Sequence, residues 1–570
     1  MVPLRLKFMK IINFLHSHIL LLILILAAFL RLWNLASLPG ALSPDEASLG
    51  YNAYSILKTA KDEYGNTLPI IFKSFGDYKP GLYIYITLPF VALFGLNEWS
   101  VRLPSALSGV LIVYLIFLVA HKFYNRKSRF LGMSFGVFAA LVAATSPWLI
   151  FFSRGAWEAN VALCLTLVGI YLFLKAMQKP IYILFAILTF SLTLITYQGA
   201  KLSTAIVTTI LLFTYWRDVV TLVRKNTKLV IISLAMALLV ALPVLLSFSQ
   251  GQTGRLKVFS VFSYPRPEDY LKNFLDEAGV DKESFMYELY YSEAFNFKRG
   301  ILGRWFNHFS GRFLFFEGDY QNPRHSAPNH GMLLLPDIIL LTFGVIFIIK
   351  SKNLDRRVKT VILVWLLLAP LPAVLSRDQV QSVRALNSAV PMAFLAGAGI
   401  YYLLAIFNKL RFKVLFFLAL LIIGPVSFIY FLDAYYVHYN KHNAKYLPYG
   451  YKEVINKISF LQGKYKRIVF QQSYNQPYIY FLFYQKYDPA TYQKQASLES
   501  GGIDVGLVKR LDNIDFINFS WPYATGEKST LLIGNDVAIP YDFSKDHYNQ
   551  IYEVKFPDGF MTAFRLVETK

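Results

Sequence analysis

Apolar runs of about 20 residues recur along roughly three-quarters of the chain, and this pattern constrains the fold more than any other feature. A helix of that length crosses the hydrocarbon core of a bilayer, which is ~30 Å thick. Only 16% of the residues are charged, against ~25% in typical soluble domains, which excludes an ordinary soluble enzyme. We predict eleven membrane spans, near residues 14–33, 103–121, 130–152, 159–177, 181–197, 202–216, 228–248, 331–350, 359–376, 388–407 and 412–432.

The apolar run 81–96 is too short to be a clear span, since 16 residues of helix reach only ~24 Å. The loop charges decide its place. If the run lies on the surface, 21 Lys and Arg fall on the N-terminal side and four in the short loops opposite. This bias follows the positive-inside rule, so we predict an interfacial helix at 81–96 and a cytoplasmic N-terminus. Topology then explains most of the net charge of +22, and no nucleic-acid partner is expected.

The last part of the chain, residues 433–570, differs from the rest in composition. It contains short aromatic and β-branched segments, such as 467–471 and 478–484, separated by turn formers. An odd number of spans places this part outside. The sequence therefore predicts a polytopic α-helical membrane domain, 1–432, with outside loops at 36–102 and 248–330, followed by an extracytoplasmic α/β or α+β domain.

Two acidic positions are candidates for catalysis or metal binding. Asp45 and Glu46 follow the first span within Ser43-Pro44-Asp45-Glu46, close to the outer interface. A carboxylate there can bind a cation or act as a base. The alternative is a helix start capped by Ser43 or Asp45, with a helix over 47–57.

Glu158 is the second acidic position, in the short outer connection between two spans. An ionisable group at the edge of the membrane is a functional candidate by default. The alternative is local pairing with Arg154, four residues earlier. Two carboxylate sites from different loops suit a divalent cation that clamps phosphate, or a base for an acceptor hydroxyl.

Basic residues in the outer loops are candidates for binding phosphate. Lys79 precedes the interfacial run, with the acid Asp77 beside it at head-group level. Arg324 and His325 lie in a loop rich in turn formers, and Arg384 is an arginine on the side where few Lys and Arg occur. The alternatives are snorkelling for the lysine and arginines and a rigid capped turn for the loop. Cys164 is the single cysteine, so a disulfide within the chain is impossible. No P-loop, Gly-x-Gly-x-x-Gly, Gly-x-Ser-x-Gly or His-Glu-x-x-His motif is present, and a nucleotide-driven mechanism has no support.

The order of the motifs resembles the N-terminal half of the GT-C glycosyltransferases. The likeness rests on Pro44-Asp45-Glu46, Gly76-Asp77-Tyr78-Lys79-Pro80-Gly81-Leu82-Tyr83, Leu93-Phe94-Gly95-Leu96-Asn97-Glu98 and Val101-Arg102-Leu103-Pro104-Ser105-Ala106. It is most similar to the superfamily of protein O-mannosyltransferases and aminoarabinose transferases, in an uncharacterised bacterial branch. The ordered match covers about residues 30–180 and continues weakly from Arg384 to Gly399.

The resemblance implies a membrane enzyme that moves a hexosyl or pentosyl group from a polyprenyl-phosphate carrier to a lipid, glycan or protein acceptor on the outer face. By that likeness Asp45 and Glu158 are the catalytic or metal-linked acids, with Glu46 beside them. Asp77, Lys79, Arg154, Arg324, His325 and Arg384 would bind substrate, and the cation would be Mg, Mn or Zn. The family often has Asp where this chain has Glu158, and often an acid where it has Tyr78. The likeness also implies the bacterial inner membrane. A lipid-linked sugar flippase or transporter, and a receptor-like protein, are the rival interpretations.

Overall fold

The computed structural model describes residues 18–126, 132–251, 260–263, 268–406, 410–472, 476–496, 498–500, 506–523 and 528–570. The basic N-terminus and the start of the predicted first span, residues 14–17, lie outside the described residues. The same holds for Lys127 and Arg129 in a predicted basic loop and for part of the outer loop 248–330.

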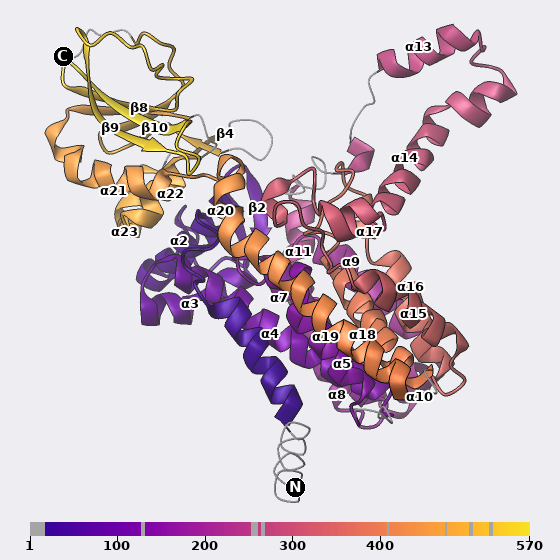
Figure 1. Cartoon of the computed structure of the whole chain (residues 1–570). Helices are drawn as coiled ribbons and strands as arrows, with labels where there is room; N and C mark the ends of the chain where they lie inside the picture. Colours follow the sequence, from indigo (N-terminus) through magenta and orange to yellow (C-terminus); the bar gives the residue numbers. More distant parts are fainter. Residues whose placement is uncertain are drawn as a thin grey trace, which may run out of the picture.

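Apolar helices form a bundle in the lower part of Figure 1. Each of the eleven predicted spans contains helix. The helices are His18–Leu32, α4 (Glu98–Phe123), α5 (Phe135–Thr145), α6 (Pro147–Phe151), α7 (Glu158–Ala176), α8 (Tyr182–Leu194), α9 (Ala200–Thr214), α10 (Trp216–Lys225), α11 (Thr227–Ser249), α15 (Asp337–Lys350), α16 (Arg356–Leu368), α17 (Leu371–Val374), α18 (Ala389–Ile406) and α19 (Leu410–Leu432).

The bundle makes the chain a multi-pass membrane protein. Among the described residues, six helical segments are long and apolar enough to cross a membrane, or seven if α9 and α10, bent by 85°, form one span. Proline shortens others: α5 ends just before Ser146 and Pro147, which begin α6. The count of eleven spans stays a prediction.

The centre of the bundle is packed closely enough for helix backbones to touch. A Cβ placed on Gly344 of α15 would meet the backbone of Leu395 in α18, and one on Gly399 would meet the backbone of Leu340. Small residues at such contacts are how membrane helices associate when apolar burial gives little driving force. The packing of α15 against α18 therefore depends on the close fit of their backbones at these two glycines.

Four elements lie at one end of the bundle, between the helix His18–Leu32 and α4. Helix α2 (Pro44–Thr59) begins after the cap Ser43, which confirms the predicted helix start. Strands β1 (Ile71–Ser74) and β2 (Asp77–Pro80) form an antiparallel hairpin. Helix α3 (Leu82–Phe94) occupies the short apolar run at 81–96. Its helical state is confirmed, while its place in the membrane interface stays a prediction.

A helical arm follows α11 and projects beyond the bundle at the upper right of Figure 1. Its chain then returns through short helical turns to α15. The elements are η1 (Val261–Ser263), α13 (Glu268–Ala278), η2 (Tyr287–Tyr291), α14 (Glu293–Asn307), η3 (Arg312–Phe316) and η4 (Pro323–His325).

After α19 the chain continues through η6 and α20 into the C-terminal sheet region, residues 444–570, at the upper left of Figure 1. Its main sheet has the order β6-β7-β3-β8-β10-β9, with β3 parallel to β7 and β8 and the other pairs antiparallel. The elements are η6 (Asp433–His438), α20 (Tyr439–His442), η7 (Ala444–Tyr446), α21 (Tyr451–Leu461), η8 (Gln462–Lys464), β3 (Arg467–Gln471), α22 (Tyr478–Tyr484), α23 (Pro489–Gln495), β4 (Leu498–Ser500), β5 (Gly506–Val508), β6 (Arg510–Leu511), β7 (Ile514–Ile517), β8 (Thr530–Gly534), β9 (Tyr548–Lys555) and β10 (Thr562–Thr569).

One predicted strand of this region is confirmed and the other is wrong. Residues 467–471 form β3, but residues 478–484 form the helix α22. All side chains from Tyr478 to Phe483 are buried, so the run is apolar on every side. Such a short run has no alternation to separate strand from helix.

The sheet region packs against the helices α2 and α3 at the end of the bundle. Its helices α22 and α23 pack against α2, and one apolar core continues from α2 and α3 into β3 and β10. Tyr480 donates a hydrogen bond to the Leu42 carbonyl (3.2 Å), and Tyr51 of α2 donates one to the Tyr487 carbonyl (3.1 Å). The sheet region therefore helps to fix α2.

Candidate functional site

The ion pair between Asp45 and Lys79 is the centre of the candidate site. Asp45 lies in the first turn of α2, and Lys79 lies on β2, 34 residues later. The ammonium of Lys79 donates to Oδ1 of Asp45. Half of the Asp45 side chain is exposed, whereas 6% of the Lys79 side chain is. The structure thus brings together two predicted site residues and turns the carboxylate outward.

The β1-β2 hairpin holds Lys79 in place. Lys79 is opposite Phe72 in the hairpin register, and its ammonium lies 5.1 Å from the centre of the Phe75 ring. Phe75 itself has φ of 59° in the turn, so the ring is placed by a left-handed backbone. A buried lysine stem with its charge over an aromatic ring loses little freedom when it meets an anion.

Glu46 points the opposite way from Asp45 and is buried. Its Oε2 accepts from the Ser43 amide (2.9 Å), which completes a capping box, and its Oε1 accepts from Arg102 Nε (3.0 Å) and the Ala156 amide (2.9 Å). These contacts tie α2 to α4 and to the loop before α7. Glu46 thus positions the turn that carries Asp45, and a catalytic role for Glu46 stays a prediction.

Arg102 is the partner of Glu46, and the prediction of site residues from sequence did not include it. Arg102 belongs to α4, and its guanidinium is fully buried. It binds several carbonyls of the loop that follows the helix His18–Leu32. Besides Glu46 it donates to the carbonyls of Leu35, Ala36, Pro39 and Ala41 at 2.9–3.3 Å. The sequence did contain a signal for Arg102: it is a charge at the start of an apolar helix, and such a charge costs free energy unless it is paired.

Arg154 is also buried, which bears on its predicted role in binding substrate. It donates to the carbonyls of Leu30 (2.8 Å) and Leu38 (3.4 Å), and its guanidinium lies 4.9 Å from the centre of the Tyr436 ring. These contacts join the helix His18–Leu32 and the loop after it to η6, which follows α19. The hydrogen bonds of Arg154 therefore position this end of the bundle.

Glu158 is the first residue of α7 and is half-buried. Both Glu158 and Glu46 act electrostatically on the hydroxyl of Tyr83, which donates to the Val101 carbonyl (2.8 Å). The neighbouring Trp157 packs edge-on against His325, with ring centres 5.4 Å apart. Glu158 therefore lies between the start of α2, which carries Glu46, and the loop that carries Arg324 and His325.

That second loop is tied to the one that carries Arg384. Asp319 Oδ2 accepts from the Ser382 amide (2.8 Å) and hydroxyl (2.7 Å) and lies 3.6 Å from His325 Nδ1. Burial alone would raise the pKa of Asp319, but His325 and Ser382 together hold it below its ordinary value. The hydrogen bonds between Ser382 and Asp319 could not be predicted from the sequence, because the two residues are 63 positions apart.

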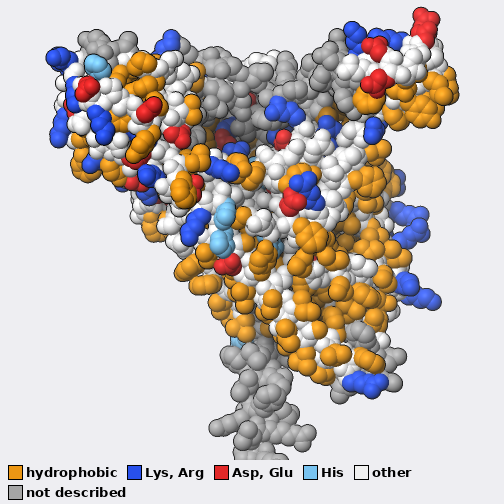
Figure 2. Space-filling view, turned by 45° about the horizontal axis from the view of Figure 1, so that its top comes forward, with side chains coloured by type: hydrophobic (Ala, Val, Ile, Leu, Met, Phe, Trp, Pro, Cys, Tyr) orange, Lys and Arg blue, Asp and Glu red, His pale blue; other side chains and the backbone are white. Residues whose placement is uncertain are grey.

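The two loops place three predicted basic residues near each other. Arg324 and Arg384 both act electrostatically on His325, and burial lowers the pKa of His325. Arg324 is exposed, while Arg384 lies 3.8 Å from Asp378. In Figure 2, charged side chains of both signs border the hollow between the sheet region and the α13–α14 arm.

Asp77, the remaining predicted residue, is buried at the start of β2 and attracts the ammonium of Lys201 on α9. Lys201 donates to Gln198, and Gln198 donates to the Tyr78 carbonyl (3.0 Å). Tyr78 precedes Lys79. Lys201 was not among the predicted site residues, yet the fold joins it to the Asp45–Lys79 pair.

The carboxylates do not form a ready metal site. Within the described part of the chain, no three His, Cys, Asp or Glu side chains are grouped so that they could hold a metal ion. Asp45 is engaged by Lys79, and Glu46 by Arg102. The cation predicted at Asp45 and Glu158 stays a prediction.

A buried acid, Glu63, lies behind the site in the loop after α2. Its Oε1 accepts from Asn52 Nδ2 (3.0 Å), and its own amide donates to Asn52 Oδ1 (3.0 Å). Burial raises the pKa of Glu63 to about 8, against the opposing effects of Asn52 and Lys79. The folded protein therefore holds a proton here that the unfolded chain releases near its ordinary pKa of 4.5.

This proton predicts a pH-dependent stability. Since the folded form binds more protons between pH 4.5 and about 8, Glu63 makes the protein less stable as pH rises through that window. Glu63→Gln keeps the bond to Asn52 and cannot ionise. We expect the unfolding temperature of this variant, relative to wild type in detergent, to rise from pH 5 to pH 9. Glu317→Gln, on the surface, should give a flat difference, and a flat difference for Glu63→Gln would contradict the assignment.

Comparison with known proteins adds to this geometry. The family model of dolichyl-phosphate-mannose-protein mannosyltransferases matches residues 78–246. The matched segment includes Lys79, Arg154 and Glu158, while Asp45 precedes it. No curated protein sequence matches the chain.

Among solved structures, ArnT from Cupriavidus metallidurans bound to undecaprenyl phosphate is 12% identical and superposes with a TM-score of 0.51, over 96% of this chain and 97% of ArnT. The chain has the GT-C glycosyltransferase fold. Apo ArnT from the same organism is 14% identical, with a TM-score of 0.48 over 84% and 88% of the two chains. An oligosaccharyltransferase from Archaeoglobus fulgidus in complex with Zn and sulfate is 13% identical, with a TM-score of 0.48 over 81% and 61%.

The GT-C fold confirms the resemblance inferred from the motifs between residues 44 and 106. It also agrees with the observed architecture, in which a helical bundle carries outer loops and a C-terminal sheet region. The roles of individual site residues rest on the contacts described above.

Proposed function

We propose that this protein is a membrane glycosyltransferase that moves a sugar from a polyprenyl-phosphate carrier to an acceptor on the outer face of the membrane. The observation that carries the proposal is the Asp45–Lys79 pair, an exposed carboxylate beside a buried ammonium at the outer end of the bundle. The GT-C fold supports it, since ArnT of this fold has been solved with undecaprenyl phosphate.

Lys79 is suited to receive the phosphate of the donor. An arriving phosphate is an anion and competes with Asp45 for the same ammonium. Binding of the donor would thus loosen the ion pair and free the Asp45 carboxylate at the moment when the sugar arrives. Arg384, Arg324 and His325 lie on the opposite loops and would hold the rest of the charged head group.

The chemistry then needs one displacement. The acceptor hydroxyl attacks the anomeric carbon, its proton passes to the Asp45 carboxylate, and the bond between that carbon and the phosphate oxygen breaks. The phosphate leaves with the electron pair as polyprenyl phosphate, its charge held by Lys79. A single displacement of this kind inverts the anomeric carbon.

The remaining predicted residues have supporting roles in this scheme. Glu46, Arg102 and Arg154 are buried and fix the loops, and Asp77 orients Lys201. The proposed reaction assigns its steps to residues of this chain. A divalent cation (Mg, Mn or Zn) stays a prediction.

The setting is proposed from the sequence. We place residues 1–432 in the membrane as the catalytic part, the N-terminus in the cytoplasm, and residues 433–570 outside the inner membrane of a bacterium. The transferred group is a hexosyl or pentosyl sugar, and the acceptor is a lipid, a glycan or a protein.

The function is tested with a panel of donors. Purified full-length protein in detergent is incubated with polyprenyl-phosphate sugars that carry a radiolabel in the sugar, with membrane extract as the acceptor source. We expect one donor to lose its label to an acceptor or to water, with release of polyprenyl phosphate. Binding of a donor with no turnover, even with extract present, would favour a flippase and contradict the proposal.

Glu158 gives a second test of the same reaction. Its charge is half-buried between the two groups of site residues, so Glu158→Gln removes a charge without removing volume. We expect transfer to fall by about 10²-fold, within the range for loss of a positioned acid or base, with unchanged membrane insertion. Glu98→Gln, on the outer end of α4, is the matched control. Full activity of Glu158→Gln would remove Glu158 from the site.

A further inference from the structure

Four buried polar side chains lie behind the Asp45–Lys79 pair and have no part in the proposed reaction. They are Ser48 and Asn52 on α2, Glu63 in the loop after α2, and Ser74 at the end of β1. Each of them is at most 3% exposed. Polar groups are costly in such surroundings unless they bond to each other. Their contacts therefore indicate what they hold in place.

The four side chains form a network that joins α2 to the β1-β2 hairpin. The hydroxyls of Ser48 and Ser74 share a hydrogen bond (3.1 Å), which is a direct link between the two elements. Asn52 Nδ2 donates to the Ser48 carbonyl and to Glu63 Oε1, both at 3.0 Å. Glu63 Oε1 also lies 3.5 Å from the Ser48 hydroxyl. Glu63 thus supports the residue of α2 that contacts the hairpin.

This link lies on the faces that carry the Asp45–Lys79 pair. Ser48 is three residues after Asp45, so the two side chains are neighbours on one face of α2. Ser74 is opposite Asp77 in the hairpin register, and Lys79, two residues after Asp77, points to the same side. The network therefore fixes the separation of α2 and the hairpin next to the point where Lys79 meets Asp45.

Glu63 has an oxygen that the network does not use. Among the described residues nothing bonds to its Oε2, although this atom is buried. Two charged side chains act on Glu63: Asp62 opposes its ionised form and Lys79 favours it. Four phenols also face it, and burial raises the pKa of each above its ordinary value: Tyr51, Tyr64, Tyr478 and Tyr492. An ionised Glu63 would therefore draw on the ammonium of Lys79.

We propose that Glu63 is a positioning residue for Lys79 and that it acts as a neutral acid. Through Ser48 and Ser74 it keeps the hairpin against α2. Without a charge of its own, it leaves the Lys79 ammonium to Asp45 and to the phosphate of the donor. The inference rests on the proposed function, because it concerns the residue assigned there to the donor phosphate.

The proposal sets a pH range for donor binding. Burial holds the pKa of Glu63 at about 8, so the acid is neutral at pH 6 and mostly ionised at pH 9. A negative charge added behind Lys79 weakens the attraction between its ammonium and a phosphate. Affinity for the donor phosphate should therefore fall as pH rises through about 8.

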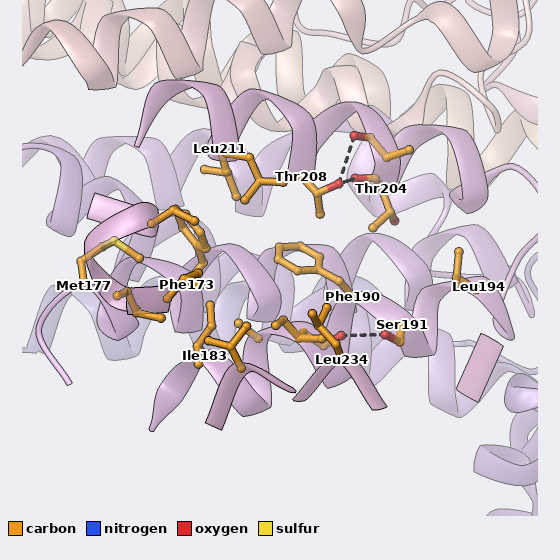
Figure 3. A pocket seen from close by; sticks show the side chains of 18 of the residues that line it. Phe173, Met177, Ile183, Phe190, Ser191, Leu194, Thr204, Thr208, Leu211 and Leu234 are labelled. Atoms are coloured by element: carbon orange, nitrogen blue, oxygen red, sulfur yellow. Dashed lines mark hydrogen bonds between the residues drawn. The ribbon is translucent and has the colours of Figure 1, made fainter. Parts of the chain in front are cut away.

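The network is separate from the apolar cavity of the bundle. That cavity, of about 420 Å³, lies between α8, α9 and α11, and Figure 3 shows its lining, with Phe173 toward one end and Leu194 toward the other. None of the four network residues is part of this lining. Substitutions in the network therefore leave the cavity wall unchanged, and their effects on binding are local to the hairpin and α2.

The test is binding of undecaprenyl phosphate to full-length protein in nanodiscs, with Kd measured at pH 6 and pH 9. Glu63→Gln keeps an acceptor for Asn52 and cannot ionise, and the ratio of wild-type to variant Kd cancels the titration of the phosphate itself. We expect this ratio to be near 1 at pH 6 and to reach about 5 at pH 9, since one charge is added near the phosphate. Glu317→Gln, on the surface, should give a ratio near 1 at both values.

A second variant separates position from charge. Ser74→Ala breaks the bond to Ser48 and should weaken binding by about 3-fold or more at both pH values. Its control, Ser233→Ala, removes a buried hydroxyl that bonds within its own helix and should leave binding unchanged. A constant ratio for Glu63→Gln from pH 6 to pH 9, or wild-type binding by Ser74→Ala, would overturn the inference and leave the proposed function standing. No binding by wild type at either pH would count against the proposed function itself.

Discussion

Replacing Asp45 by Asn is expected to lower sugar transfer by about 10²–10⁴-fold, the contribution of a positioned general base. The amide keeps the size and the helix-start position of Asp45 but cannot accept the proton of an acceptor hydroxyl. Because Glu46 and Ser43 form the cap of α2, the helix should stay folded. The measurement is transfer of labelled sugar by purified protein, with kcat and KM determined separately.

The control is an aspartate in a similar setting. Asp433 pairs with His438 at 3.3 Å, and its side chain is 53% exposed, against 50% for Asp45. Asp433→Asn should leave transfer unchanged. Lys79→Met should mainly raise KM for the donor, because Lys79 is assigned to the phosphate, whereas Asp45→Asn should mainly lower kcat. Equal and small effects of both variants would mean that the pair is a structural ion pair only.

Replacing Arg102 by Met is expected to destabilise the protein by about 3–5 kcal/mol, the cost of leaving the partner of a buried ion pair uncompensated. Glu46 would keep its charge without its guanidinium, and four carbonyls of the loop after the helix His18–Leu32 would lose their donor. The measurement is the unfolding temperature of detergent-purified protein, together with the folded yield.

Two further variants separate charge from packing. Glu46→Gln combined with Arg102→Met removes both charges and should recover part of the lost stability. Lys452→Met breaks the Lys452–Glu98 pair, whose lysine side chain is 58% exposed, and should cost about 0–1 kcal/mol. If Arg102→Met unfolds at the wild-type temperature, the loop does not depend on this guanidinium.

The sequence is enough to predict the elements whose signal is local. Apolar length located the helices of the bundle, and Ser43 or Asp45, with acids in the first turn, marked the start of α2. The same reasoning failed at α22, where seven apolar residues carry no period that distinguishes helix from strand. The breaks between α5 and α6 and between α16 and α17 were also missed, because each lies inside one predicted span, 130–152 and 359–376.

The candidate site is only partly predictable for a related reason. Asp45, Lys79, Glu158 and Arg384 stand out as charges in apolar surroundings, and this can be seen in the sequence. The contacts that place them join distant positions: Arg102 to Glu46 across 56 residues, and Ser382 to Asp319 across 63. Lys201 became a candidate site residue only because folding brings it close to Tyr78. Residues that pair over such distances in the chain have no regular spacing that could be recognised in the sequence.

The shared core of α2 and the sheet region has a consequence for biogenesis. Leu42 and its partner Tyr480 are 438 positions apart, so at 5–20 residues per second the ribosome needs about 20–90 s to make the second after the first. For that time α2 exposes the apolar face that α22 later covers. The turn bearing Asp45 is therefore among the first parts of the protein to be made and among the last to mature, and chaperones that shield nascent chains have a window there in which to act.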